Sequence, residues 1–374
     1  GDTSYIYKYA LSPLAQFCVD NFTPTTVAPN VITTGGLIFS LLSFVITIVY
    51  NPTLSVDAPR WIHLATAVNL FIYQTLDNMD GKQARKTGSS SALGMIYDHG
   101  IDAINAGLLM LPIASALGTG ETMKLFLLYG MGFFPFYMQG WEEFYREELV
   151  LPVVNGPTEG LLVVMGLCTT SFFHGAEFWQ DSIATSPELL QKYSFLPTSY
   201  SNFDILALAF AIATICTTAC NFIVALPMAE KKENSSAPRA LLNLVPFVVF
   251  CVSAFCWCFL SQVALQKYAI WTTLLLGSVF VELITHVMLM HICHSYIRPG
   301  ERYTMWIPLV LAANVAFCPS DGALVDESLL IIPLTLLSIA YSTHRFCMIC
   351  CEAADALDIF VYRMGKRSAV KKMD

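Results

Sequence analysis

The amino-acid sequence predicts an all-α polytopic membrane protein with about ten transmembrane helices and an N-terminal amphipathic helix at the membrane surface. Apolar residues make up 55% of its 374 positions and charged residues only 13%, about half the share found in soluble proteins. Ten stretches approach the roughly 20 apolar residues that cross a bilayer core. No stretch shows the two-residue alternation of a half-buried strand. The composition therefore excludes a secreted disulfide scaffold, a coiled coil, a disordered chain and an ordinary cytosolic enzyme.

The predicted elements follow one another with short polar connectors between them. Residues 5–22 are expected to form the amphipathic helix on the cytosolic membrane surface, and a short helix packed on the protein is the alternative. The same region lacks a continuous apolar core, so we expect no cleavable signal peptide. The transmembrane helices are predicted at residues 30–50, 60–78, 93–117, 123–141, 157–175, 203–226, 240–260, 268–292, 303–319 and 328–348.

Basic residues predict the orientation of these helices. If the N-terminus lies in the cytosol and the chain alternates sides, 16 of the 20 lysine and arginine residues are cytosolic. The other side keeps Arg60, Lys124, Lys192 and Lys267. Both termini then face the cytosol. The predicted parts are an interfacial helix and linker (1–29), a transmembrane domain (30–348, catalytic core about 30–226) and a basic cytosolic tail (349–374).

Four aspartates stand where the second predicted span ends and the third begins. Asp77 and Asp80 are three residues apart, and Asp98 and Asp102 are four apart, so each pair shares one helix face. Carboxylates at membrane depth are costly and usually functional. If the two helices are neighbours, the four carboxylates converge and require cations. Hard oxygen ligands favour Mg²⁺, Mn²⁺ or Ca²⁺, and a two-metal arrangement fits four carboxylates.

The residues around these aspartates suit phosphate chemistry. Gly81 and Gly94 remove side chains where a ligand could approach the backbone, and Arg85 with Lys82 supplies positive charge. No GxxxxGK[ST] loop is present, so a P-loop nucleotide site is excluded. The alternative is a polar connection between helices in which acids and bases only pair with one another.

One motif joins these positions. The pattern D-x2-D-G-x2-A-R-x8-G-x3-D-x3-D is matched at every fixed position, by Asp77, Asp80, Gly81, Ala84, Arg85, Gly94, Asp98 and Asp102. It resembles the signature of the CDP-alcohol phosphotransferase family. Residues 5–9, 29–33, 80–100 and 155–160 are similar to the eukaryotic choline/ethanolamine phosphotransferases. The resemblance covers most of residues 3–165 and is weaker afterwards.

The resemblance implies transfer of phosphocholine or phosphoethanolamine from CDP-choline or CDP-ethanolamine to diacylglycerol, with release of CMP. It also implies two Mg²⁺ ions, for which Mn²⁺ can substitute, held by the four aspartates. The expected partners are membrane lipid and a second copy in a homodimer, with no nucleic acid, in the endoplasmic reticulum or Golgi. The expected CDP and phosphate ligands are Asn30, Thr33, Gly81, Lys82, Ala84, Arg85 and Gly94. For Asn30 and Thr33, helix capping and packing is the alternative.

Two residues are candidates for the base that deprotonates the acceptor hydroxyl. Asp102 often has this role in the family. His99 lies three residues earlier, about 60° away around the helix, and a free imidazole has a pKa near 6.5. A metal-held Asp102 would be a poor base, so we favour His99. A role for His99 in orienting a carboxylate is the alternative.

We expect a further site that binds the head group of the donor. An aromatic face beside carboxylates is what an ammonium group needs. The candidates are Trp141, Glu142, Tyr145 and Glu159. The alternative is an interfacial aromatic belt with solvated acids.

Three other functions compete with this interpretation. An ion-coupled transporter would spread its charges over several spans, whereas the acids here concentrate at one helix pair. A related enzyme that uses a different alcohol or acceptor, such as CDP-diacylglycerol with a soluble alcohol, shares the motif but tends to be shorter. A catalytically inactive scaffold is disfavoured by the complete motif.

Overall fold

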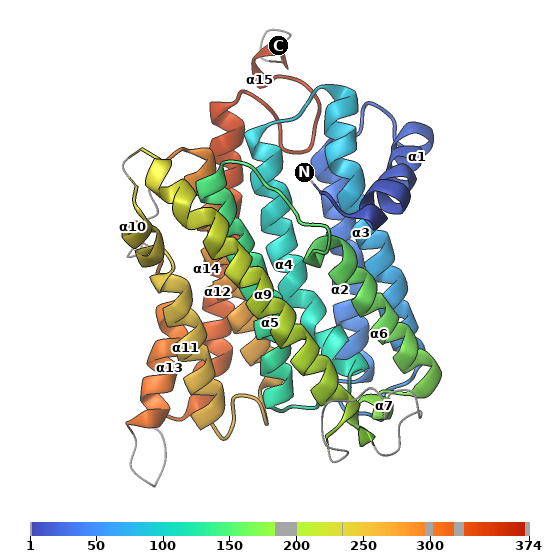
Figure 1. Cartoon of the computed structure of the whole chain (residues 1–374), viewed down its shortest axis with the longest axis vertical. Coiled ribbons are helices and arrows are strands. Elements are labelled where there is room, and N and C mark those ends of the chain that lie inside the picture. The colour runs from blue at the N-terminus through green and yellow to red at the C-terminus, as the bar shows by residue number, and fades with distance from the viewer. Residues whose placement is uncertain (1, 184–199, 234, 296–301, 318–324, 371–374) are drawn as a thin grey trace.

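Long helices lying side by side make up the described part of the chain (Figure 1). The computed structural model describes residues 2–183, 200–233, 235–295, 302–317 and 325–370. The helices are η1 (Tyr7–Leu11), α1 (Ser12–Phe22), α2 (Pro29–Tyr50), α3 (Trp61–Thr87), α4 (Ala92–Ala116), α5 (Met123–Arg146), η2 (Gly156–Gly160), α6 (Leu161–His174), α7 (Glu177–Gln180), α9 (Asn202–Lys231), α10 (Ala237–Leu242), α11 (Val245–Leu260), α12 (Ala269–Ile292), α13 (Trp306–Ala316), α14 (Glu327–Ala356) and α15 (Arg367–Val370). The prediction of an all-helical fold is confirmed for these residues.

Each predicted span contains a helix, with differences at the ends. The span at 157–175 begins with the π-helical turn η2 before α6, and the span at 240–260 is divided between α10 and α11. Helix α3 continues nine residues past the predicted end at residue 78 and stops only at Gly88. Gly88 has φ 63°, a left-handed conformation that glycine adopts without strain. The first half of the aspartate motif is therefore helical, and the connection to α4 is short.

Five helical stretches are long and apolar enough to cross a membrane when only the described residues are considered. They are α2, α9, α10 together with α11, α12 and α14. Helices α3 and α4 do not belong to this set, although each is longer than 20 residues. Their sequences contain the four aspartates together with asparagine, glutamine and histidine, which lowers their hydropathy. The protein is thus an integral membrane protein whose polar helices lie among apolar ones.

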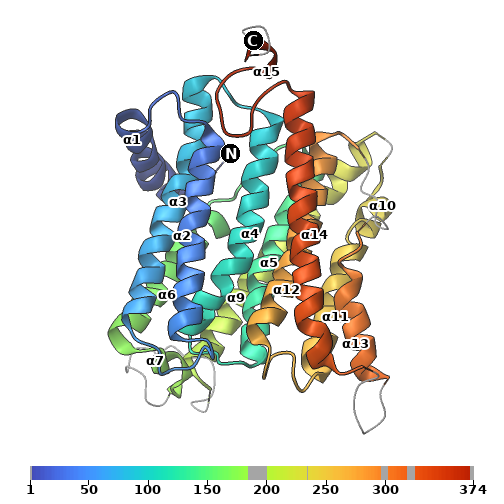
Figure 2. The ribbon, with the colours of Figure 1, turned by 180° about the vertical axis from the view of Figure 1, so that it is seen from behind.

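The two ends of the bundle differ in the elements that they carry. Helix α1, α15 and both chain ends lie at one end, and α7 lies at the other (Figure 2). The described basic residues Arg60 and Lys124 belong to the α7 end, because they stand at the starts of α3 and α5. Lys192, predicted for the same side, lies outside the described residues.

The N-terminal amphipathic helix combines both predicted roles. Ala15 and Val19 are fully buried, because α1 packs against α3. Tyr9, Phe17 and Phe22, at 69%, 56% and 70% exposed, are apolar and unburied. One face of the helix is therefore packed on the protein, and the other is free to enter the membrane interface.

Helix α4 is the centre of the packing. It contacts α2, α5, α12 and α14, and α2 also packs along α3. Two glycines bring α4 and α12 together, because a Cβ atom on Gly107 would lie 3.4 Å from the Cα atom of Gly277. The helix that carries Asp98 and Asp102 is thereby fixed from several sides.

The C-terminal region, expected as a basic tail at residues 349–374, begins as helix and then folds back on the protein. Residues 349–356 are the last turns of α14, and the chain then folds back, with a bridge between Ile359 and Lys366. The amide of Asn30 donates a hydrogen bond to the carbonyl oxygen of Val361 at 3.0 Å. The segment after α14 therefore lies against the start of α2.

Candidate active site and metal centre

Three of the four motif aspartates converge between α3 and α4. Asp77, Asp98 and Asp102 each offer a carboxylate oxygen, and these oxygens lie within 4.8 Å of one another. Asp77 comes from α3 and the other two come from α4. The helical spacing of the motif produces this arrangement, because residues three or four apart point in one direction.

The fourth aspartate is held from α2. The Thr33 hydroxyl donates a hydrogen bond to Asp80 Oδ2 at 2.5 Å, and the Asp80 carboxyl group also interacts with Asp98. Asp80 is buried. Helix α2 therefore fixes one edge of the cluster through the contact between Thr33 and Asp80.

A tyrosine that the sequence analysis missed completes the cluster. The Tyr73 hydroxyl donates a hydrogen bond to Asp102 Oδ1 at 2.8 Å. Tyr73 precedes Asp77 by four residues, so the helix period places both on the same face of α3. That spacing was the available signal. Tyr73 fixes the orientation of the Asp102 carboxyl group.

The donor set fits a hard divalent cation. All ligand atoms offered are carboxylate oxygens, which Mg²⁺ and Mn²⁺ prefer. Asp98 Oδ1 is buried and has no hydrogen-bond partner among the described residues. A buried carboxylate oxygen without a donor is costly unless a cation neutralises it. Asp77, Asp98 and Asp102 could therefore hold a metal ion.

The two motif glycines leave space beside the carboxylates. A Cβ atom on Gly81 would approach only the Arg85 guanidinium, at 3.6 Å, and one on Gly94 would approach only Ser91 Oγ, at 3.7 Å. These are ordinary contacts, so packing does not require either glycine. The backbone there is open to a ligand. Ser91 caps α4 by accepting a hydrogen bond from the Gly94 amide at 3.2 Å.

The basic residues of the motif have different partners. Lys82 Nζ donates to Ser12 Oγ of α1 at 2.8 Å, and Lys86 Nζ donates to the carbonyl oxygen of Val19 at 2.6 Å. Arg85 is exposed and makes no hydrogen bond or ion pair within the described part of the chain. Lys82 thus attaches α1 to the motif helix, whereas the guanidinium group of Arg85 is exposed to solvent.

Other residues around the motif are fixed by distant segments. Tyr97 bonds to Thr34 of α2 at 2.8 Å and to Tyr362 at 2.9 Å through its hydroxyl group. Together with the bond from Asn30 to Val361, these contacts place the fold-back segment beside the predicted nucleotide ligands of α2. Ala84 is half-buried on α3, and its carbonyl oxygen caps the helix by accepting from Ser89 N at 2.9 Å. Sequence reasoning had no local signal for the contribution of residues 361 and 362.

His99 points toward α12. Its Nδ1 atom lies 3.0 Å from the sulfur atom of Met288. A thioether can only accept a hydrogen bond, so this contact requires the proton on Nδ1 and leaves the lone pair on Nε2. Asp102, by contrast, is turned toward α3 through Tyr73. The two candidate bases therefore have separate environments on neighbouring faces of α4.

Of the four predicted head-group residues, Trp141 and Tyr145 pack edge to face, with ring centroids 5.5 Å apart, whereas the two glutamates make their polar contacts elsewhere. Trp141 Nε1 donates to the carbonyl oxygen of Ala240 in α10 at 3.1 Å, and the Tyr145 hydroxyl accepts from Asn243 at 2.6 Å. Glu159 accepts hydrogen bonds from Ser4 Oγ and from the Asn155 amide. This places it beside the N-terminal segment.

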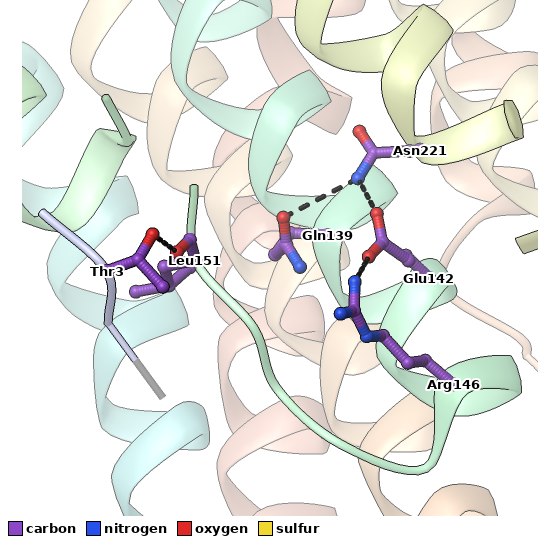
Figure 3. Close-up of polar contacts among 6 residues, drawn as sticks. All are labelled: Thr3, Gln139, Glu142, Arg146, Leu151 and Asn221. Atoms are coloured by element: carbon purple, nitrogen blue, oxygen red, sulfur yellow. Dashed lines mark hydrogen bonds and ion pairs between the residues drawn. The ribbon is translucent and has the colours of Figure 1, made fainter. Parts of the chain in front are cut away.

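Glu142 makes its polar contacts with residues of α5 and α9. It accepts from Arg146 Nη1 at 3.1 Å and from Asn221 Nδ2 of α9 at 2.7 Å (Figure 3). Both of its oxygens are therefore engaged on the face of α5 that meets α9.

Comparison with known proteins identifies the family. A family model described as CDP-alcohol phosphatidyltransferase matches residues 26–180, which include the whole motif. Two Arabidopsis thaliana proteins, choline/ethanolaminephosphotransferases 1 and 2, are 32% and 33% identical, each over 98% of this chain and 95% of the relative. Cholinephosphotransferase 1 of Saccharomyces cerevisiae is 31% identical over 68% of this chain and 66% of its own length. With a motif whose carboxylates converge and relatives that match along nearly its full length, this chain belongs to the CDP-alcohol phosphatidyltransferase family.

Proposed function

We propose that this protein transfers phosphocholine, phosphoethanolamine or both from the CDP-linked alcohol to diacylglycerol, releasing CMP and forming phosphatidylcholine or phosphatidylethanolamine. The converging carboxylates of the aspartate motif are the main support for this function. The carboxylates of Asp77, Asp98 and Asp102 lie within 4.8 Å of one another, in a chain that is 32% identical to a relative named choline/ethanolaminephosphotransferase 1. The reaction needs such a site, because a diphosphate is cleaved and negative charge develops on the leaving CMP.

Different residues of the site have different roles in the proposed reaction. Asp77, Asp98 and Asp102, with Asp80 beside them, would hold two Mg²⁺ ions, and Thr33 and Tyr73 orient the carboxylates. When bound, the metal supplies positive charge next to the diphosphate. Arg85 adds a cation at the cytosolic edge, and Gly81 and Gly94 allow the phosphates to approach the backbone.

His99 is the base in this proposal. Its Nε2 atom takes the proton of the diacylglycerol hydroxyl group while that oxygen forms a bond to the phosphorus that carries the choline or ethanolamine. The bond from this phosphorus to the oxygen of CMP breaks, and CMP leaves with the electron pair. The contact with Met288 supports the role, because it keeps the Nε2 lone pair unprotonated.

The membrane arrangement is part of the proposal. All ten helical segments cross the bilayer, with the aspartates and both termini on the cytosolic side of the endoplasmic reticulum or Golgi. The water-soluble donor then enters from the cytosol, whereas diacylglycerol arrives within the membrane. A homodimer is also part of the proposal, carried by the family resemblance.

The direct test is an assay of the purified protein. It is supplied with diacylglycerol, Mg²⁺ and either CDP-choline or CDP-ethanolamine, and the release of CMP and the lipid product are measured. We expect CMP and lipid to form in equal amounts with at least one donor. CMP release without a lipid product, or no reaction with either donor, would refute the proposed function.

A further inference from the structure

The segment that follows α14 closes on itself before the chain reaches α15. Residues 357–366 form this fold-back segment, and an isolated bridge joins Ile359 to Lys366 near its two ends. Directly after it, the Arg367 guanidinium group forms an ion pair with Asp355 of α14. The segment descends from α14 toward the ends of α2 and α4 (Figure 2). Its base is thus fixed on α14, and its tip is presented to these two helices.

The tip of the fold-back segment contacts α2 and α4, the helices that lie on either side of the aspartate cluster. The Asn30 amide of α2 donates to the carbonyl oxygen of Val361 at 3.0 Å. The Tyr362 hydroxyl lies 2.9 Å from the hydroxyl of Tyr97 in α4, and the two rings pack edge to face with centroids 5.8 Å apart. Because a carbonyl oxygen can only accept, the first contact determines which end of the Asn30 amide faces the segment.

Tyr97 connects the fold-back segment to the candidate metal site. Its hydroxyl also lies 2.8 Å from Thr34 Oγ1, so α2, α4 and the segment meet at one atom. Each partner is next in sequence to a residue of the cluster. Tyr97 precedes Asp98, and Thr34 follows Thr33, whose hydroxyl donates to Asp80. A shift of α2 relative to α4 at Tyr97 would therefore move the aspartates relative to one another.

Core packing does not account for Tyr362. The residue is 53% exposed, so its burial contributes less to stability than that of a core side chain. What it adds is a hydrogen bond and a ring contact at a fixed place. The candidate bases are held from elsewhere, because His99 contacts Met288 and Asp102 accepts from Tyr73. Loss of the Tyr362 contact should therefore change the spacing of the helices more than the environment of either base.

We propose that the fold-back segment is part of the donor-binding site. Tyr362 is a positioning residue, which acts through Tyr97 to hold α2 and α4 at the spacing that the CDP-alcohol donor requires. A site that already has the geometry of the bound state binds more tightly, because less conformational freedom is lost on binding. This inference rests on the proposed function.

Tyr362→Phe tests the hydrogen bond, because it removes the hydroxyl and keeps the ring. The KM for the CDP-alcohol donor should rise roughly 3- to 10-fold, the value of one hydrogen bond, with kcat nearly unchanged. Tyr303→Phe is the matched control. Tyr303 also packs edge to face on a tyrosine, Tyr341, but its hydroxyl makes no hydrogen bond within the described residues. This control should leave both KM and kcat unchanged.

A double-mutant cycle tests whether Tyr362 acts through Tyr97. In a Tyr97→Phe protein the bond is already absent, so adding Tyr362→Phe should raise KM little further. Thr34→Val removes the other bond of the Tyr97 hydroxyl and should itself raise KM, which can be measured even if Tyr362→Phe does not fold.

Two results would overturn the inference. One is an unchanged donor KM in Tyr362→Phe or in Thr34→Val. The other is a pair of effects, from Tyr97→Phe and Tyr362→Phe, that simply add in the double variant. Absence of turnover by the wild-type protein with every CDP-alcohol would instead refute the proposed function, and this inference with it.

Discussion

Asp98 is the residue whose environment most directly calls for a cation. One of its oxygens is buried without a partner among the described residues, and the other carboxylates of the cluster lie around it. Hydrogen bonds from Thr33 and Tyr73 reach Asp80 and Asp102. Asp80, Asp98 and Asp102 therefore have different environments, although the motif treats the aspartates alike.

Replacing Asp98 or Asp80 by Asn should abolish transfer while the protein stays folded. The amide keeps the shape but removes the charge that holds the metal, so we expect a loss of at least roughly 10²-fold in kcat/KM. CMP release measures activity, and gel filtration in detergent measures folding. Asp20→Asn in α1, whose carboxylate bonds only to Gln16 in the described structure, is the control. Wild-type turnover that persists in excess EDTA would contradict the metal site.

Tyr73→Phe isolates the hydrogen bond to Asp102. The ring and its packing remain, but Asp102 loses its donor. We expect the Mg²⁺ concentration that gives half-maximal activity to rise roughly 10- to 100-fold, or kcat to fall by a similar factor, as for other residues that orient a metal ligand. A titration of activity with Mg²⁺ measures it. Tyr50→Phe, at the far end of α2, should leave the titration unchanged. An unchanged Tyr73→Phe curve would show that the bond is dispensable.

His99 and Asp102 can be separated by what each variant loses. If His99 takes the proton, His99→Ala should lower kcat by roughly 10²–10⁴-fold and barely change donor binding. Asp102→Ala should weaken Mg²⁺ and donor binding, because it removes a ligand of the cluster. Binding of the CDP donor and single-turnover rates measure the two effects. If His99→Ala keeps near wild-type kcat, or binds donor as poorly as Asp102→Ala, then Asp102 becomes the better candidate for the base.

At the scale of elements, the site depends on how closely α4 approaches its neighbours. Helix α2 packs along both α3 and α4, and its Thr33 reaches Asp80. On the other side, Gly107 and Gly277 allow α4 and α12 into backbone contact, which brings Met288 to His99. Small residues at a helix crossing are a common means of close packing in membranes.

Gly107→Leu should therefore reduce both stability and activity. The larger side chain has no room against Gly277 and must separate the two helices, at a cost of about 1–3 kcal/mol. Thermal unfolding in detergent and kcat measure the two effects. Gly130→Leu is the control, because a Cβ atom there meets nothing within 4 Å. A Gly107→Leu protein with normal stability and kcat would show that the close approach is not required.

At the scale of the whole molecule, the alternation of the helices gathers distant parts of the chain at the same end of the bundle. The catalytic motif, α1 and the C-terminal fold-back segment all belong to one end of the bundle (Figure 1). Most described lysine and arginine residues stand in helix ends and connections at that same end. By the positive-inside rule, we therefore expect the end that carries the motif to face the cytosol.

The sequence contains two N-glycosylation sequons, Asn21-Phe22-Thr23 and Asn234-Ser235-Ser236, and this orientation predicts that neither is used. Asn21 lies at the end of α1, and the second sequon, at Asn234, lies outside the described residues. Both are expected in the cytosol, where the glycosylation machinery does not act. Glycosidase treatment of membranes from a glycosylating cell should cause no mobility shift. A sequon introduced between residues 51 and 60, at the opposite end, should be modified. A glycan mapped to Asn21 would reverse the orientation.

The sequence alone determined the helices and which aspartates share a helix face, whereas the packing of α3 beside α4 brought the two pairs together. Apolar stretches of bilayer length form helices because lipid offers the backbone no other hydrogen-bond partners. Residues three and four apart share a helix face whatever surrounds them, so the motif contained its own geometry. The same rule places Tyr73 beside Asp77, a signal that was present but not used. The family resemblance rested on these positions, and the comparisons confirmed it.

Tertiary structure decided which side chains reach the site from elsewhere in the chain. Met288 touches His99 from 189 positions away, and Val361 reaches Asn30 across 331 positions. No local pattern encodes such distances, because they depend on which helices pack together. The same holds for Glu142 and Glu143, which are chemically identical neighbours in the sequence. Packing of α9 against one face of α5 brings Asn221 to Glu142, whereas Glu143 is buried on another face, because helices present adjacent residues in different directions.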